Sequence, residues 1–239
     1  MRSIKQTREP LALRQWKRQN EGLPDGQTYP PPGNILQVIK DALHKEQMGL
    51  CAYTLRKLQT PLDGHVEHIV PQKQQPDKVL DYANMVLCFP PNGGDTSFGY
   101  GAPVKGGRHV QLNVDFVSPH SKGCDKRFIY KSNGEILPVT NDAAAEGTIH
   151  SVQLNCESLR DLRQAAIAAQ GLTLRKPRTT RRQVRGRTVA EAKRLASNIL
   201  KPDANGELDA FCIAINQVAL SYARAENVRS KGIAVSRKK

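Results

Sequence analysis

Long apolar runs are absent from the sequence, and their absence excludes one class of protein. No stretch of the 239 residues approaches the roughly 20 consecutive apolar residues that a membrane-spanning helix requires. Residues 1–6 are charged and contain no apolar core, so they do not have the pattern of a secretory signal. We therefore expect a cytoplasmic protein that has no membrane partner.

The sequence also lacks cysteines in a pattern that would suggest disulfide pairs. The five cysteines are an odd number and lie far apart in the chain: Cys51, Cys88, Cys124, Cys156 and Cys212. In a reducing compartment such a set predicts free thiols and excludes a scaffold built on disulfides. The chain is long enough for one large domain, or for a smaller domain with an extension, and it contains no internal repeat.

Acidic residues are few relative to basic ones. Lysine and arginine together number 36, and aspartate and glutamate 22, which gives a formal net charge of +14 at pH 7. A surface this basic attracts polyanions through long-range steering and through the release of counterions. The composition therefore favours nucleic acid as a partner, over solubility alone or an acidic protein partner.

One basic run, residues 175–187, contains no acidic residue. Arginine outnumbers lysine in it, and the planar guanidinium suits bidentate contact with phosphate. A solvated linker is the other interpretation of this run. The candidate nucleic-acid contacts are Arg175, Lys176, Arg178, Arg181, Arg182, Arg185 and Arg187. Phosphate contacts of this kind do not distinguish DNA from RNA.

Apolar periodicity predicts helices near both ends of the chain. After an irregular arm over residues 1–32, Asn34 is a good N-cap for a helix that ends near Met48. The later helix that starts at Thr188 opens with the sequence of a capping box, which ends at Glu191. The remaining predicted helices cover residues 141–153, 156–170 and 208–222.

Two hairpins are predicted between these helices. Residues 65–70 and 85–89 form the strands of the first hairpin, around the polar loop 72–81. Residues 127–130 and 135–139 form the second, around Asn133-Gly134, a strong two-residue turn signal. Residues 95–123 are rich in glycine and lack periodicity, so we expect a long surface excursion there.

The first hairpin carries residues suited to phosphodiester hydrolysis. His68 can act as a base because a histidine pKa lies near working pH, and Glu67 and Asn92 offer oxygen ligands to a hard divalent ion. Neighbouring residues of a regular strand face opposite ways, so Glu67 and His68 share a site only if the strand bends or ends there. Pro71 makes such an end plausible, and Asn84 would either hold the loop or orient His68.

These residues resemble the signature of the HNH endonucleases. The matching segments are Glu67-His68-Ile69-Val70-Pro71, Asn84-Met85-Val86-Leu87-Cys88 and Asn92. The resemblance implies an α+β protein with a ββα-metal core embedded in a mostly helical domain. It also implies that His68 is the general base, that Glu67 and Asn92 bind Mg²⁺ or Mn²⁺, and that Asn84 is the middle, positioning residue.

The flanking segments are similar to PtuB, the HNH nuclease subunit of Septu and retron-associated anti-phage systems. The similarity covers roughly residues 1–170 and includes the Asn133-Gly134 hairpin. It implies an ATPase partner, PtuA, a DNA or tRNA substrate, and in retron versions a reverse transcriptase with its RNA–DNA product. The alternative is a non-catalytic nucleic-acid-binding or scaffold subunit of such a complex.

The expected organisation has three parts. Residues 1–50 form an arm and a helix, residues 51–140 the nuclease core, and residues 141–239 a helical region that includes the basic run.

The sequence also departs from the family pattern. Many HNH proteins hold zinc with two Cys-x-x-Cys pairs, but here Cys51 is followed by Thr54 and Cys88 by Pro91. Two thiolates do not complete a tetrahedral site, so free cysteines are the default, with zinc on Cys51, Cys88 and Cys124 as the alternative. A lysine that often follows the final Asn is replaced by Gly93-Gly94-Asp95. Asp95 is therefore a candidate additional metal ligand. His65, two residues before Glu67 on the same strand face, is a candidate accessory residue for metal or phosphate, with a structural histidine as the alternative.

Overall fold

The computed structural model describes residues 1–22, 28–172 and 187–236. The protein is of the α+β class, and these residues form helices along the chain with two small antiparallel hairpins between them. Within these described ranges, no helix combines the length and the apolar character that crossing a membrane requires.

The N-terminal region contains a helix that the sequence did not predict. Helix α1 spans Leu11–Gln19, so the expectation of an irregular arm was wrong for this segment. Leu13 is the one residue that α1 buries. A single buried position produces no apolar periodicity in the sequence, so no pattern predicts this helix. Helix α2 follows over Gly33–Glu46 and packs against α1. Pro32, and not Asn34, is its N-cap, since the fixed φ of proline suits the start of a helix.

The first hairpin forms where the sequence predicts it. Strand β1 (His65–His68) pairs antiparallel with β2 (Met85–Cys88), with His65 opposite Cys88 and His68 opposite Met85. Every residue of β2 is buried, and α2 packs against the hairpin. The loop between the two strands contains two 3₁₀ helices, η2 (Pro76–Lys78) and η3 (Tyr82–Asn84). A further 3₁₀ helix, η1 (Pro61–Asp63), lies just before β1.

Residues 95–123 are part of the fold, so the expected surface excursion is wrong for much of this segment. It contains helix α3 (Ala102–Lys105), and Tyr100, Phe116 and Val117 lie in the core. Their spacing follows neither a helix nor a strand, which is why no pattern in the sequence marks them as buried.

The second hairpin and its helices complete the central body. Strand β3 (Phe128–Tyr130) follows η4 (Cys124–Arg127) and pairs with β4 (Ile136–Pro138) through the predicted Asn133-Gly134 turn. Helix α4 (Ala143–Ser151) packs against β4, and α5 (Glu157–Ala169) lies behind the turn. The buried Arg163 of α5 connects this helix to the turn, because its Nε donates to the Gly134 carbonyl at 2.7 Å.

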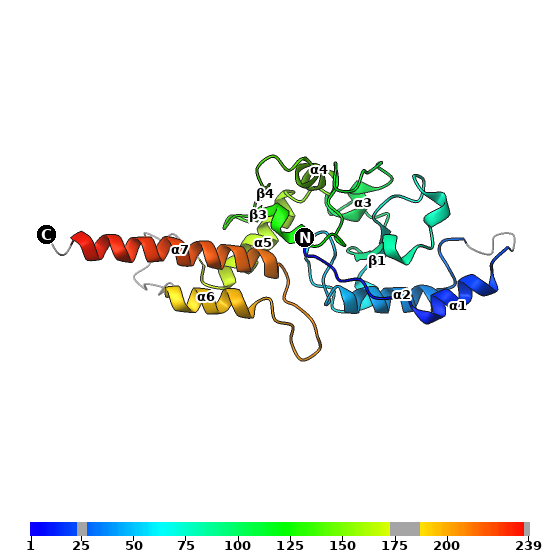
Figure 1. Ribbon diagram of the computed structural model, residues 1–239, viewed down its shortest axis with the longest axis horizontal. Helices are drawn as coiled ribbons and strands as arrows, with labels where there is room; N and C mark the ends of the chain where they lie inside the picture. The colour runs from blue at the N-terminus through cyan, green and yellow to red at the C-terminus, as the bar shows by residue number, and fades with distance from the viewer. Residues whose placement is uncertain (23–27, 173–186, 237–239) are drawn as a thin grey trace.

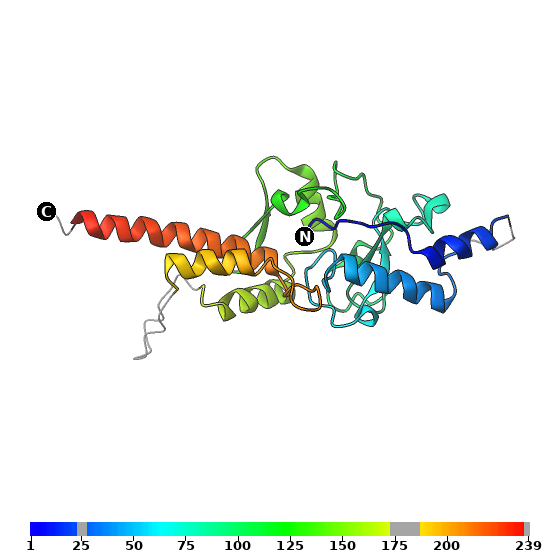
Figure 2. The same ribbon diagram turned by 60° about the horizontal axis from the view of Figure 1, so that its bottom comes forward.

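The C-terminal helices form an antiparallel pair that extends from one end of the molecule, opposite α1 and α2 (Figures 1 and 2). Helix α6 (Val189–Asn198) begins at the predicted capping box, with Thr188 bonding the Glu191 amide and Glu191 bonding back. Helix α7 (Cys212–Ser236) is longer than the predicted segment 208–222.

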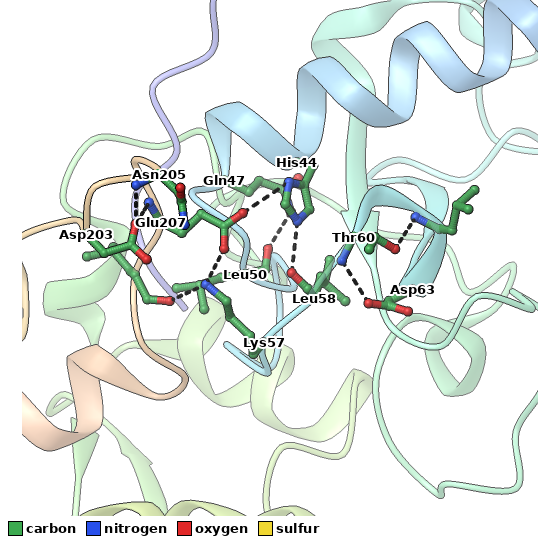
Figure 3. A network of polar contacts seen from close by, with 12 residues as sticks. His44, Gln47, Leu50, Lys57, Leu58, Thr60, Asp63, Asp203, Asn205 and Glu207 are labelled. Carbon is green, nitrogen blue, oxygen red and sulfur yellow. Dashed lines mark hydrogen bonds and ion pairs between the residues drawn. The ribbon is translucent and has the colours of Figure 1, made fainter.

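A polar network joins this pair to the body (Figure 3). Glu207, in the loop between α6 and α7, forms an ion pair with Lys57 at 2.6 Å. Lys57 also donates to the Leu208 carbonyl at 3.1 Å, and the Leu208 amide donates to the Met48 carbonyl at 2.9 Å. The C-terminal pair is thus attached to the segment that leads from α2 to the first hairpin.

Candidate functional site

His68 occupies the last position of β1 and is 5% exposed. Its Nε2 lies 2.8 Å from the Val79 carbonyl, which only accepts, so Nε2 carries the proton and Nδ1 the lone pair. The Gln72 amide donates to Nδ1 at 3.1 Å, and the Tyr29 ring meets the imidazole edge-on at 4.7 Å. Burial lowers the pKa of His68 below 6.5 and outweighs the Val79 hydrogen bond. The imidazole is therefore neutral near pH 7, as a general base must be.

Asn84 fixes the chain that follows His68. Its Oδ1 accepts from the Val70 amide and its Nδ2 donates to the Val70 carbonyl, each at 2.8 Å. The Asn84 carbonyl also accepts from the Ile69 amide at 2.9 Å. Of the two predicted roles, holding the loop and orienting His68 directly, these contacts correspond to the first.

Glu67 is paired with a lysine that the sequence did not single out. Lys105 Nζ lies 2.6 Å from Glu67 Oε1, and its side chain has 0% exposure against 14% for that of Glu67. Lys105 also donates to the His68 carbonyl at 3.1 Å, and Tyr53 donates to Glu67 Oε1 at 3.4 Å. Burial raises the pKa of Glu67, and the nearby Lys105 opposes this rise.

Glu67 and His68 nevertheless line the same pocket. Along the strand they alternate, with Glu67 half-buried and His68 buried. Because β1 ends at His68, the chain turns there and both side chains reach the hollow. The residues that line it are Glu67, His68, Pro71, Gln72, Lys73, Gly106 and Gly107.

Asn92 and Asp95 lie in the loop beyond β2, and His65, the first residue of β1, contacts the same loop. The exposed Asn92 folds its side chain onto its own loop, with Oδ1 accepting from the Gly94 amide at 3.0 Å. Asp95 does the same with the Ser97 amide at 2.9 Å, and hydrogen bonds from the Ser97 side chain and from this amide lower the pKa of Asp95. His65 donates from Nδ1 to the Pro90 carbonyl, and its ring lies so close to Gly93 that a Cβ there would come within 2.8 Å. His65 thus braces the loop.

A divalent ion does not fit this arrangement of Glu67 and Asn92. Glu67 Oε1 is already paired with the Lys105 ammonium, and Asn92 Oδ1 already accepts from the Gly94 amide. Two unit charges 4 Å apart interact by about 4 kcal/mol at an effective dielectric constant near 20, so a divalent ion beside Lys105 would be repelled by about 8 kcal/mol. Among the residues with described positions, no three His, Cys, Asp or Glu side chains converge as metal ligands.

The three cysteines proposed for zinc lie in two places. Cys51 and Cys88 are buried together, whereas the buried Cys124 contacts Ser3 and the Pro119 carbonyl. Burial would raise the pKa of Cys51, but hydrogen bonds from Cys88, Thr54 and the Phe89 amide lower it to about 6. Thr54 stands where the second cysteine of a Cys-x-x-Cys pair would be, and it forms a hydrogen bond with the Cys51 thiol.

Most of the predicted nucleic-acid contacts fall outside the described residues. This applies to Arg175, Lys176, Arg178, Arg181, Arg182 and Arg185. Arg187 is described and half-buried, and its guanidinium donates to the Gln170 carbonyl while its own carbonyl accepts from Tyr222. One of the seven candidates therefore has a contact that joins α5 to α6 and α7.

Sequence reasoning missed Lys105, Gln72 and Tyr53. The role of Lys105 could not be predicted because its partner, Glu67, lies 38 positions earlier in the chain, and no local sequence pattern indicates such a contact. The one available signal is its setting, a single lysine in Gly101-Ala102-Pro103-Val104-Lys105-Gly106-Gly107. Apolar residues and glycines on both sides mark it as the only charge in a short packed turn.

A search of protein-family models finds no match to the chain, and a search of curated proteins finds none either. The likeness to HNH nucleases consequently rests on the motif residues and their placement.

Proposed function

We propose that this protein is an HNH-type endonuclease, with a ββα core, that hydrolyses phosphodiester bonds of DNA or tRNA. The observation that carries the proposal is the state of His68. It is a neutral histidine with one tautomer set by Val79, and its lone pair faces Gln72 at a pocket. The partner of this nitrogen is the side chain of another pocket residue, and a water molecule in the pocket can take its place.

The proposed reaction follows from this geometry. A water molecule replaces the Gln72 amide at His68 Nδ1, the nitrogen takes a proton from it, and the water oxygen attacks phosphorus. The bond from phosphorus to the leaving oxygen breaks, and solvent protonates that oxygen. Asn84 supports the reaction as a positioning residue, because it fixes Ile69 and Val70 directly after the base.

The cation requirement remains part of the proposal, with Glu67 as the carboxylate. Mg²⁺ or Mn²⁺ supplies positive charge to the phosphate in nucleases of this kind. Asn92, Asp95 and His65 would have to leave their loop contacts to take part. No step of the reaction described above depends on them.

The proposed setting is an anti-phage complex with an ATPase partner, PtuA, and in retron versions a reverse transcriptase with its RNA–DNA product. The net charge of +14 supports nucleic acid as the substrate class. The paired Glu67 and Lys105 are consistent with an effector that rests in an inactive form.

The same ion pair favours a second candidate, a non-catalytic nucleic-acid-binding or scaffold subunit. In such a protein the hairpin would persist as structure, and Lys105 would permanently neutralise a carboxylate that no longer binds an ion. In this alternative the two hydrogen bonds of His68, to Val79 and from Gln72, would serve only to hold the loop.

A substrate panel tests the proposal. The purified chain, with and without its ATPase partner, is incubated with end-labelled single-stranded DNA, duplex DNA and tRNA in Mg²⁺ or Mn²⁺. We expect cleavage of at least one substrate, its loss in EDTA and its return when the ion is added back. Binding of these substrates without cleavage, in the chain and in the complex, would support the scaffold instead.

A further inference from the structure

We propose that Lys105 is an internal cation that closes the Glu67 site, so that a divalent ion binds only after this ammonium has left. The inference rests on the proposed function, which makes Glu67 a ligand, and adds a way in which the site is held inactive.

The contacts of Lys105 place it where a cation would be. Its Nζ lies 2.6 Å from Glu67 Oε1 and 3.1 Å from the His68 carbonyl, which are two oxygens at the edge of the pocket. Carboxylate and carbonyl oxygens are also the ligands that hard divalent ions prefer. An ion bound to Glu67 would lie beside this ammonium, and the repulsion between the two positive charges sets their binding in competition.

A role in contacting the substrate does not fit the position of this lysine. Its side chain has 0% exposure, so its ammonium does not reach a phosphate in the pocket. A buried ion pair also adds little stability compared with apolar residues of similar size. The pair is therefore better explained by what it does to Glu67 than by a contribution to folding.

The chain around Lys105 allows it to move. Lys105 is the last residue of α3, a helix of only one turn. Gly106 follows with φ of 52°, a left-handed value that glycine adopts without strain, and both Gly106 and Gly107 are exposed and line the pocket. Nothing lies within 4 Å of a Cβ built on Gly107. A shift of these two glycines would uncover Lys105 without displacing the buried Ala102 and Pro103.

Binding of Mn²⁺, measured by electron paramagnetic resonance on the whole purified chain, tests the inference. We expect Lys105→Met to bind at least about 10-fold more tightly than the wild type, because the competing charge is removed. Adding Glu67→Gln to Lys105→Met should abolish that gain. Lys73→Met is the matched control, since Lys73 is an exposed lysine of the same pocket, and its affinity should stay within about twofold of the wild type.

Equal affinity of Lys105→Met and the wild type would overturn the inference, and so would a gain that survives Glu67→Gln. Circular dichroism and thermal unfolding establish that the variants fold. If Lys105→Met does not fold, hydrogen exchange of the wild type decides. Saturating Mg²⁺ should then speed exchange at residues 101–107, and unchanged exchange contradicts the inference.

The nuclease function and the role of Lys105 can be contradicted independently of each other. His68→Ala should keep the Mn²⁺ affinity of the wild type, so the ion-binding experiment is informative even in a protein that cleaves nothing. Conversely, cleavage that depends on His68 while Lys105→Met binds Mn²⁺ no better would retain the nuclease and discard the role of Lys105.

Discussion

At the scale of single residues, the site is defined by which hydrogen-bond partners are already taken. His68 has one nitrogen committed to Val79 and the other shared with a side chain that water can replace. Glu67 has Oε1 paired with Lys105, and Asn92 has Oδ1 bonded to the Gly94 amide. His68 can therefore accept a proton in this structure, whereas Glu67 and Asn92 would first have to exchange a partner to bind an ion.

The pH dependence of cleavage follows from His68. Burial lowers its pKa below 6.5, and only the unprotonated ring accepts a proton from water. We expect kcat/KM to be flat above pH 6.5 and to fall on the acid side, with a midpoint below that value. Folding stability should change in the same direction. It is fully present above pH 6.5 and lost as pH falls through the lowered pKa, because the unfolded chain takes up the proton first. A midpoint above about pH 7 would mean that another group limits the rate.

At the scale of elements, the hairpin depends on the turn that Asn84 holds. Asn84 is 8% exposed, and its side chain satisfies both polar groups of the Val70 backbone. Because β1 is only four residues long, this turn determines where Glu67 and His68 meet at the pocket.

Asn84→Ala should therefore destabilise the protein measurably. The change leaves two buried backbone groups without partners, and each costs about 1–3 kcal/mol, so we expect a loss of about 2–6 kcal/mol. Urea unfolding followed by circular dichroism measures it. The exposed Asn92→Ala is the control, and it should change the free energy of unfolding by less than about 0.5 kcal/mol. Similar losses in both variants would show that Asn84 does not hold the turn.

How far the sequence predicted these elements depends on whether a local pattern exists. The repeated apolar spacing of α2 and the capping box at Thr188 are local, and both helices were found. Helix α1 buries a single leucine, and residues 95–123 bury aromatic residues at irregular spacing, so neither gave a signal. In the candidate site, the motif predicts roles for Glu67, His68 and Asn84, and those roles stay predictions, whereas the pairing of Glu67 with Lys105 depends on the tertiary fold.

At the scale of the whole molecule, the candidate site and the C-terminal helices are connected. The loop before α7 is attached by Glu207 and Leu208 to the segment between Met48 and Lys57 (Figure 3). The same segment supplies Tyr53, which contacts Glu67. A partner that binds the extended α6–α7 pair would thus act on a part of the chain that reaches the site.

The central claim is that this molecule is a nuclease with His68 as its base, and the single-turnover cleavage rate of His68→Ala tests it most directly. His109→Ala is the matched control, because His109 is an exposed histidine outside the pocket. Loss of a general base lowers the rate by about 100- to 10,000-fold, and we expect a loss of that size for His68→Ala and none for His109→Ala. Equal rates for His68→Ala and the wild type, on the substrate that the wild type cleaves best, would contradict the account.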